Sequence, residues 1–118
     1  MAKKTLELLT ESMFYVLMSF RESVRCGTEI AEFVSNKTKG RVKLGPGTLY
    51  TILGKFEEEH FIREIQVEGR KRTYEITEKG RQAYEGEVNR LRACLADAES
   101  EGRYEADKKR TFGEASGQ

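Results

Sequence analysis

The chain has little with which to build a metal centre, a disulfide framework or a cofactor site. Its 118 residues include two cysteines, one histidine, one proline and no tryptophan. Cys26 and Cys94 lie far apart, no Cys-x-x-Cys pair occurs, and His60 is the single histidine, so a zinc site made of Cys and His would have too few ligands. We therefore expect reduced thiols, no metal and no cofactor.

Long hydrophobic runs are also missing. Glu7 and Glu11 interrupt the first apolar stretch, which disfavours a signal peptide, and no run is long enough to span a bilayer. No Ser/His/Asp set or carboxylate pair stands out, and residues 45–47 lack the third glycine and the preceding strand of a dinucleotide loop. These absences favour a cytoplasmic protein that is not an enzyme and has no membrane partner.

Charge of one sign does not dominate the chain, whose formal net charge is +1. The charges are nevertheless segregated, because residues 36–72 hold nine Lys or Arg against five Glu, and the flanks are acidic. A basic middle segment is compatible with nucleic-acid binding, although most charge clusters are only solvated faces. The length and the 37% apolar share indicate one globular domain.

Two helices are predicted in the first forty residues. Thr10 can cap the first helix, which is expected to continue to about Phe20. The second helix is expected to open at Gly27 and to end before Gly40. Its buried stripe is predicted to consist of Ile30, Phe33 and Val34.

The segment 44–59 is the most informative part of the sequence. Pro46 can occupy a first helical position. Apolar residues then follow at the i, i+3, i+4, i+7 spacing of one buried helix face: Leu49, Ile52, Leu53 and Phe56. The opposite face carries Thr48, Thr51 and Lys55, and Tyr50 lies near the boundary between the two faces.

The period then changes from that of a helix to that of a strand. Ile65 and Val67 alternate with polar residues, as do Tyr74 and Ile76, and a turn is expected at residues 68–71. Three helices followed by a hairpin with a basic tip is the order of a winged helix-turn-helix. The predicted fold class is therefore mostly α with a small β-hairpin.

A last helix is predicted to begin after Thr77, which can cap it. Its apolar residues recur at steps of four, three and four, as in a heptad seam: Tyr84, Val88, Leu91 and Leu95. Two copies packing along this seam would bury it, although it could also pack on its own domain. The predicted organisation is a winged-helix domain over residues 1–76, a dimerisation helix over 77–100 and a disordered tail over 101–118.

The predicted DNA-contacting residues belong to the third helix, its approach and the hairpin. A short helix can enter the major groove, its N-terminus favours an anion, and the hairpin can reach phosphates nearby. The candidates are Lys43, Gly47, Thr48, Tyr50, Thr51, Lys55, Arg70, Lys71 and Arg72. The third helix lacks an obvious base-reading Asn, Gln or Arg, so we expect mostly positioning contacts to the backbone.

Three segments resemble the PadR-like family of bacterial transcriptional regulators. Residues 9–18 (LTESMFYVLM) resemble the first helix of the family. The stretches GPGTLY (45–50) and FEEEHFI (56–62) are similar to its recognition helix and the exit from it, and EGRKRTYEITEKG (68–80) is similar to its wing and last helix. Together the resemblance covers residues 9–98.

The resemblance implies a winged helix that dimerises through its C-terminal helix and usually acts as a repressor. The residues implied to face DNA are Thr48, Tyr50, Arg70, Lys71 and Arg72. Some family members bind aromatic drugs against tryptophan, which this chain lacks. The last helix also looks short, which implies a compact dimer without a deep ligand site.

The resulting hypothesis is a homodimeric repressor that binds a pseudo-palindromic operator in double-stranded DNA. Two alternatives stay open. A winged helix that has lost DNA binding could be a protein-interaction module, which the low net charge allows. The chain could also be a ligand-sensing regulator with a small-molecule effector of unknown identity.

Overall fold

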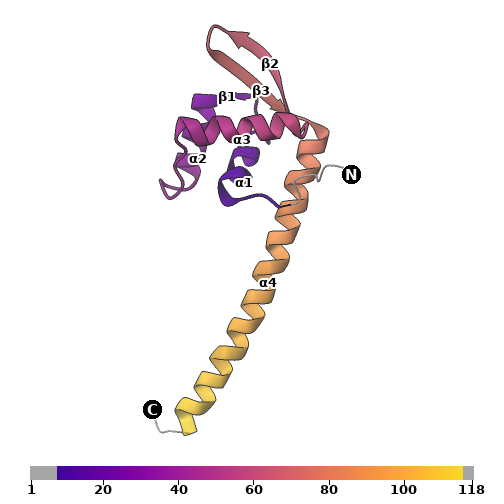
Figure 1. Cartoon of the computed structure of the whole chain (residues 1–118). Helices are drawn as coiled ribbons and strands as arrows, with labels where there is room; N and C mark the ends of the chain where they lie inside the picture. The colour runs from indigo at the N-terminus through magenta and orange to yellow at the C-terminus, as the bar shows by residue number, and fades with distance from the viewer. Residues whose placement is uncertain (1–7, 116–118) are drawn as a thin grey trace. The chain divides into compact units, whose positions relative to one another are not determined.

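A computed structural model describes residues 8–115, with side chains described through residue 102. The elements follow one another along the chain as shown in Figure 1: α1 (Glu11–Met18), β1 (Arg25–Cys26), α2 (Gly27–Lys37), α3 (Pro46–Glu58), β2 (Ile62–Glu68), β3 (Lys71–Ile76) and α4 (Glu78–Ala115). This order, mostly helical with a small antiparallel sheet, confirms the predicted winged helix-turn-helix with a long C-terminal helix.

The sheet has three strands rather than the predicted two. Its order is β1-β3-β2, and both pairings are antiparallel. Strand β1 pairs Arg25 with Tyr74 and Cys26 with Thr73 of β3. A strand of two residues carries no alternating pattern, so only its tertiary pairing reveals it.

Strand β2 departs from the regular alternation that the sequence predicts. The register shifts between Glu64 and Gln66, so Ile65 lies at a bulge. Ile65 and Val67 are both exposed, whereas Phe61, just before the strand, and Ile62, at its start, are buried. The apolar side chains of the outer half of β2 are therefore on the surface.

The helix starts follow their capping residues. Thr10 caps α1, because its hydroxyl oxygen accepts a hydrogen bond from the Met13 amide at 3.1 Å. At α2 the Cys26 amide donates to the Glu29 carboxylate at 2.9 Å, as in a capping box. Helix α3 begins at Pro46, as predicted, whereas α1 ends at Met18, two residues before the expected position.

The core lies between the three short helices and the sheet. The predicted buried face of α3 is confirmed, since all four of its apolar residues are nearly inaccessible. Other residues of the winged-helix unit are equally buried and complete the core: Val16, Leu17, Phe20, Ile30, Val34 and Phe61. Phe33 differs from its prediction, because it is only half-buried and lies beside a surface hollow.

The first turns of α4 belong to the winged-helix unit, which extends to Glu87. The Gly80 amide donates to the Thr77 hydroxyl at 3.0 Å, which confirms Thr77 as the cap. Tyr84 is buried, and its ring stacks on Phe14 with the ring centroids 5.3 Å apart. Glu87 is also buried, and its carboxylate accepts a hydrogen bond from the Leu9 amide at 2.9 Å.

A second unit starts at Val88 and consists of the rest of α4. Val88 is half-buried, whereas every described side chain from Leu91 to Gly102 is exposed. Helix α4 has 38 residues and ends at Ala115. This corrects two predictions, a short last helix that ends at residue 100 and a disordered tail over residues 101–115. The segment is polar, but it contains no proline and is rich in residues of high helix propensity. The last three residues of the predicted tail lie outside the described part of the chain.

None of the helices described here is both long enough and apolar enough to cross a membrane. Helix α4 has the length, but its charged residues occur along all of it.

Candidate nucleic-acid interface

Helix α3 presents a polar face to the surface because its apolar face is used in the core. Thr48, Thr51 and Lys55 are all exposed on this polar face. The helix starts with Gly45 at the cap position and Pro46 inside, and Gly45 has no side chain with which to cap the first amides. Those amides point along the helix axis toward any anion placed there.

The wing is the hairpin of β2 and β3. Gly69 occupies its turn with φ +60°, a left-handed conformation that glycine adopts without strain. The three basic residues that follow the turn, Arg70, Lys71 and Arg72, are exposed. Arg72 also forms an ion pair with Glu64 across the two strands, with 3.3 Å between guanidinium nitrogen and carboxylate oxygen.

A groove of about 460 Å³ separates α3 from the wing. The residues that line it come from both elements: Tyr50, Leu53, Gly54, Glu57, Gly69, Arg70, Arg72 and Tyr74. Burial raises the pKa of the Tyr74 hydroxyl, and the nearby Glu57 carboxylate raises it further, so this phenol stays protonated at neutral pH. The groove therefore presents two phenol hydroxyls, two arginines and the Glu57 carboxylate.

Tyr50 connects this groove to the start of α2. Its side chain is 54% exposed. A methyl group added at Gly27, the first residue of α2, would lie only 3.0 Å from the Tyr50 hydroxyl. The phenol therefore lies across the N-terminus of α2, which places the Tyr50 hydroxyl at the junction of two helices.

Ion pairs neutralise only part of the basic middle segment. Arg41 pairs with Glu11, and Arg63 pairs with Glu75 at 2.5 Å. Within the described residues, four of the predicted DNA-contacting cations have no carboxylate at ion-pair distance: Lys43, Lys55, Arg70 and Lys71. These side chains are available to an external anion.

Comparison with known proteins decides the family. The transcriptional regulator PadR-like family matches residues 16–86, which run from α1 through the wing into α4. The chain belongs to this family. As a PadR-like protein it is a DNA-binding transcriptional regulator and not an enzyme.

Solved structures share the PadR-like fold at low sequence identity. A transcriptional regulator from Clostridium thermocellum is 22% identical with a TM-score of 0.68, over 75% of this chain and 89% of its own. A PadR family regulator from Clostridium difficile R20291 is 17% identical with a TM-score of 0.67, over 77% of this chain and 97% of its own.

A third structure contains DNA. Bacillus subtilis PadR in complex with operator DNA is 21% identical with a TM-score of 0.55, over 62% of this chain and 44% of its own. A comparison with curated proteins finds no match.

The predicted PadR-like site residues fall into two groups in the structure. The nine DNA-contacting candidates are all exposed on α3, the segment before it and the wing, and their contacts to DNA stay predictions. The four seam candidates differ in burial. Tyr84 is buried in the winged-helix unit, whereas Leu91 and Leu95 are 40% and 58% exposed. Among the described residues, no group of three side chains could hold a metal ion.

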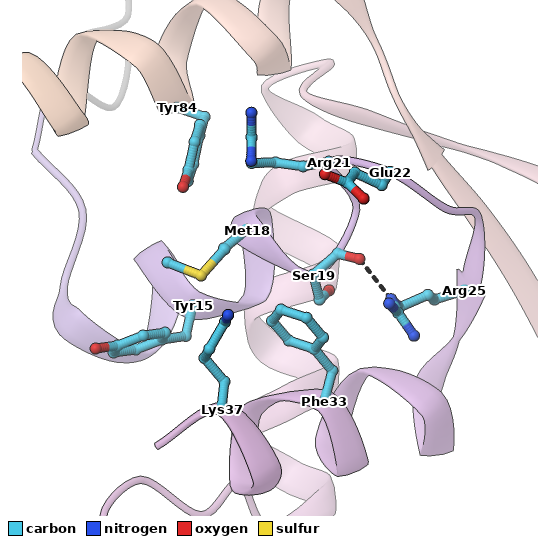
Figure 2. A pocket seen from close by; sticks show the side chains of 9 residues that line it. All are labelled: Tyr15, Met18, Ser19, Arg21, Glu22, Arg25, Phe33, Lys37 and Tyr84. Atoms are coloured by element: carbon cyan, nitrogen blue, oxygen red, sulfur yellow. Dashed lines mark hydrogen bonds between the residues drawn. The ribbon is translucent and has the colours of Figure 1, made fainter.

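A second cluster of cations, shown in Figure 2, is not predicted from the sequence. Arg21, Arg25 and Lys37 line a hollow together with Phe33, which had been assigned to the core. The sequence holds one indication of this cluster, because Phe33 and Lys37 are four residues apart on one helix and therefore share a face. The two arginines reach the same hollow from the segment before β1 and from β1 itself.

Proposed function

We propose that the protein is a homodimeric repressor that binds a pseudo-palindromic operator. Each copy places α3 in the major groove and its wing on the neighbouring backbone. The observation that carries this proposal is the exposed polar face of α3 beside cations that have no ion-pair partner in the described chain. Small hydroxyl side chains at Thr48 and Thr51 let the helix approach a phosphate closely.

The homodimer is supported by the exposed apolar stripe of α4. Val88, Leu91 and Leu95 recur at steps of three and four, and the two leucines are exposed in a single chain. A helix that holds leucines at this spacing is stabilised when a second helix covers them. Tyr84 is not included in this seam, because Phe14 already covers its ring.

The palindrome follows from the symmetry of the dimer. A twofold axis relates the two copies of α3, so each copy reads the same half-site on opposite strands. The complex of Bacillus subtilis PadR with operator DNA supports this use of the fold. The absence of Asn, Gln and Arg from α3 predicts that affinity comes mainly from phosphate contacts.

The experiment is selection of bound duplexes from random DNA by the full chain, followed by sedimentation of the protein with a selected duplex. We expect an inverted repeat with half-sites about 10 base pairs apart and two chains per duplex. A reporter gene downstream of the selected site should be expressed less when the protein is present. Any of three results would contradict the proposal: no enriched sequence, an enriched single half-site that is bound by one chain, or a rise in reporter expression.

A further inference from the structure

A hollow of about 490 Å³ lies between the end of α1, the segment that leads to β1, helix α2 and the first turns of α4 (Figure 2). Its position differs from that of the groove between α3 and the wing, because the two share no lining residue. Small-molecule sites in proteins have volumes of about 300 to 1,000 Å³. The hollow is therefore large enough for a small organic ligand.

Aromatic rings, rather than carboxylates, hold the cations of this hollow. The Arg25 guanidinium lies 4.9 Å from the centre of the Phe33 ring, and the Lys37 ammonium lies 5.9 Å from it. The Arg21 guanidinium lies 5.4 Å from the centre of the Tyr84 ring. A guanidinium that uses its face against a ring keeps its N–H edges for hydrogen bonds in its own plane.

One of these arginines is also oriented by the backbone. The Arg25 Nε donates a hydrogen bond to the Ser19 carbonyl, drawn as the dashed line in Figure 2. Arg25 belongs to β1, which pairs with β3, so the sheet fixes the backbone from which the side chain extends. This cation is ordered before any ligand arrives, which lowers the entropic cost of binding an anion.

The charge of the hollow favours a ligand with two negative charges. Among the described residues that line the hollow, Arg21, Arg25 and Lys37 are cations and Glu22 is the one carboxylate. Glu29 and Glu32 line a second hollow, which shares Arg25, Phe33 and Lys37 with this one. Arg81 of α4 lies close by, since it donates to the Arg21 carbonyl at 3.3 Å. A carboxylate ligand with one charge would leave part of this excess uncompensated, whereas a phosphate monoester carries nearly two charges at neutral pH.

We propose that this hollow binds the phosphate monoester of a small organic molecule. The N–H edges of Arg21 and Arg25 and the Lys37 ammonium contact the phosphate oxygens. The side chains of Met18, Phe33 and Tyr84 form the apolar wall for the organic part. The site goes beyond the proposed repressor function and needs neither DNA nor a second copy, so its failure would leave that function untouched.

The test is calorimetric titration of the full chain at pH 7.5 with phenyl phosphate, inorganic phosphate and benzoate. We expect phenyl phosphate to bind at least about tenfold more tightly than either of the other two, because each lacks one feature that the hollow recognises. No saturable binding of phenyl phosphate, or equal binding of benzoate, would overturn the assignment to phosphate esters. If inorganic phosphate binds as tightly as phenyl phosphate, the proposed recognition of the organic group by the apolar wall is wrong.

Matched variants locate the binding. Lys37→Gln and Arg21→Gln each remove one charge-assisted hydrogen bond from an exposed side chain, so each should weaken phenyl phosphate about tenfold. Lys39→Gln removes the same charge just beyond α2, outside the hollow, and should leave the affinity unchanged. If all three variants weaken binding equally, the ligand responds only to net charge and the proposed site is wrong.

Discussion

Gly80 shows how a single missing side chain allows the winged-helix unit to close. A Cβ atom at this position would lie 2.1 Å from the Phe61 carbonyl oxygen and 2.8 Å from the Ile76 side chain. The first contact is with backbone, which cannot rotate away. The start of α4 can therefore lie against the start of β2 only because residue 80 is glycine.

We expect Gly80→Ala to destabilise the protein by about 3 kcal/mol, since the added methyl group must push α4 and β2 apart. Gly86→Ala is the matched control on the same helix, because nothing lies within 4 Å of the added atom. There alanine should stabilise the helix by up to about 1 kcal/mol. Urea unfolding measures both changes, and equal stability of the two variants would contradict the contact.

A residue-scale effect of pH is expected at the capping box of α2. Hydrogen bonds from the Cys26 amide and side chain lower the pKa of Glu29 below its ordinary value of 4.5. A lowered pKa in the folded state contributes stability that is present above the unfolded value and is lost as the pH falls through the folded value. The contribution of Glu29 should therefore be complete at pH 7 and decline below about pH 4.5.

Glu29→Gln should cost about 0.5 kcal/mol at pH 7, a small value because the carboxylate is exposed and screened by water. The difference from the original protein should shrink as the pH falls through the lowered pKa of Glu29, because the protonated carboxyl is neutral like the glutamine amide. Glu32→Gln lies on the same helix without this bond and serves as the control. Unfolding measured at pH 7 and pH 3.5 checks the change, and a difference that stays constant with pH would rule out this role.

At the scale of an element, α3 separates a buried face from an exposed polar face, which we propose contacts DNA. The buried face consists of its four apolar residues, and the opposite face bears Thr51 near its middle. Because the two faces are distinct, a substitution on the exposed face can alter binding without changing the core.

Thr51→Glu should lower DNA affinity by at least about tenfold, because a carboxylate on this face repels phosphates. The melting temperature should stay close to that of the original protein, since Thr51 is exposed. Asn36→Glu makes the same change of charge on the exposed side of α2 and should affect binding much less. A mobility-shift titration with a selected duplex compares the two, and equal losses would indicate a general charge effect.

At the scale of the whole molecule, the surfaces that we propose for DNA binding and for dimerisation lie in different parts of the chain. The wing lies within the unit that extends to Glu87, and the exposed leucines lie in the unit that begins at Val88. If the proposal is right, each function can be removed on its own.

Changing Arg70, Lys71 and Arg72 together to Ala should weaken binding to every DNA sequence. Each lost phosphate contact should also reduce the slope of log affinity against log salt by about 0.9. Arg63→Ala, which removes an exposed arginine of β2 that pairs with Glu75, is the control. If the triple variant shifts a selected duplex as well as the original protein does, the assignment of the wing to DNA is wrong.

The double variant Leu91→Lys, Leu95→Lys should be monomeric in sedimentation, because it places charges at the centre of the proposed seam. It should also bind a full inverted repeat at least about tenfold more weakly than the original protein, since the two half-sites are then bound separately. The control, Asn89→Lys with Ala93→Lys, changes exposed residues on the other side of the same helix. A dimeric Leu91→Lys, Leu95→Lys variant would contradict the proposed seam.

Much of this protein was determined by the sequence itself. The apolar spacing in α3, the proline at its start and the threonine caps of α1 and α4 act over a few residues, so they predict the elements that the structure contains. The order of three helices and a hairpin then predicts the winged helix, and the exposed face of α3 follows from its buried one.

Tertiary structure alone decided the rest, because it depends on residues that are distant in the sequence. Strand β1 exists only through its pairing with β3. Tyr84 continues the heptad spacing of α4, yet the Phe14 ring, seventy residues earlier in the chain, buries it in the winged-helix unit. The hollow with Arg21, Arg25 and Lys37 likewise forms where separate elements meet. Local patterns report which face of a helix is apolar, but only packing determines what covers that face.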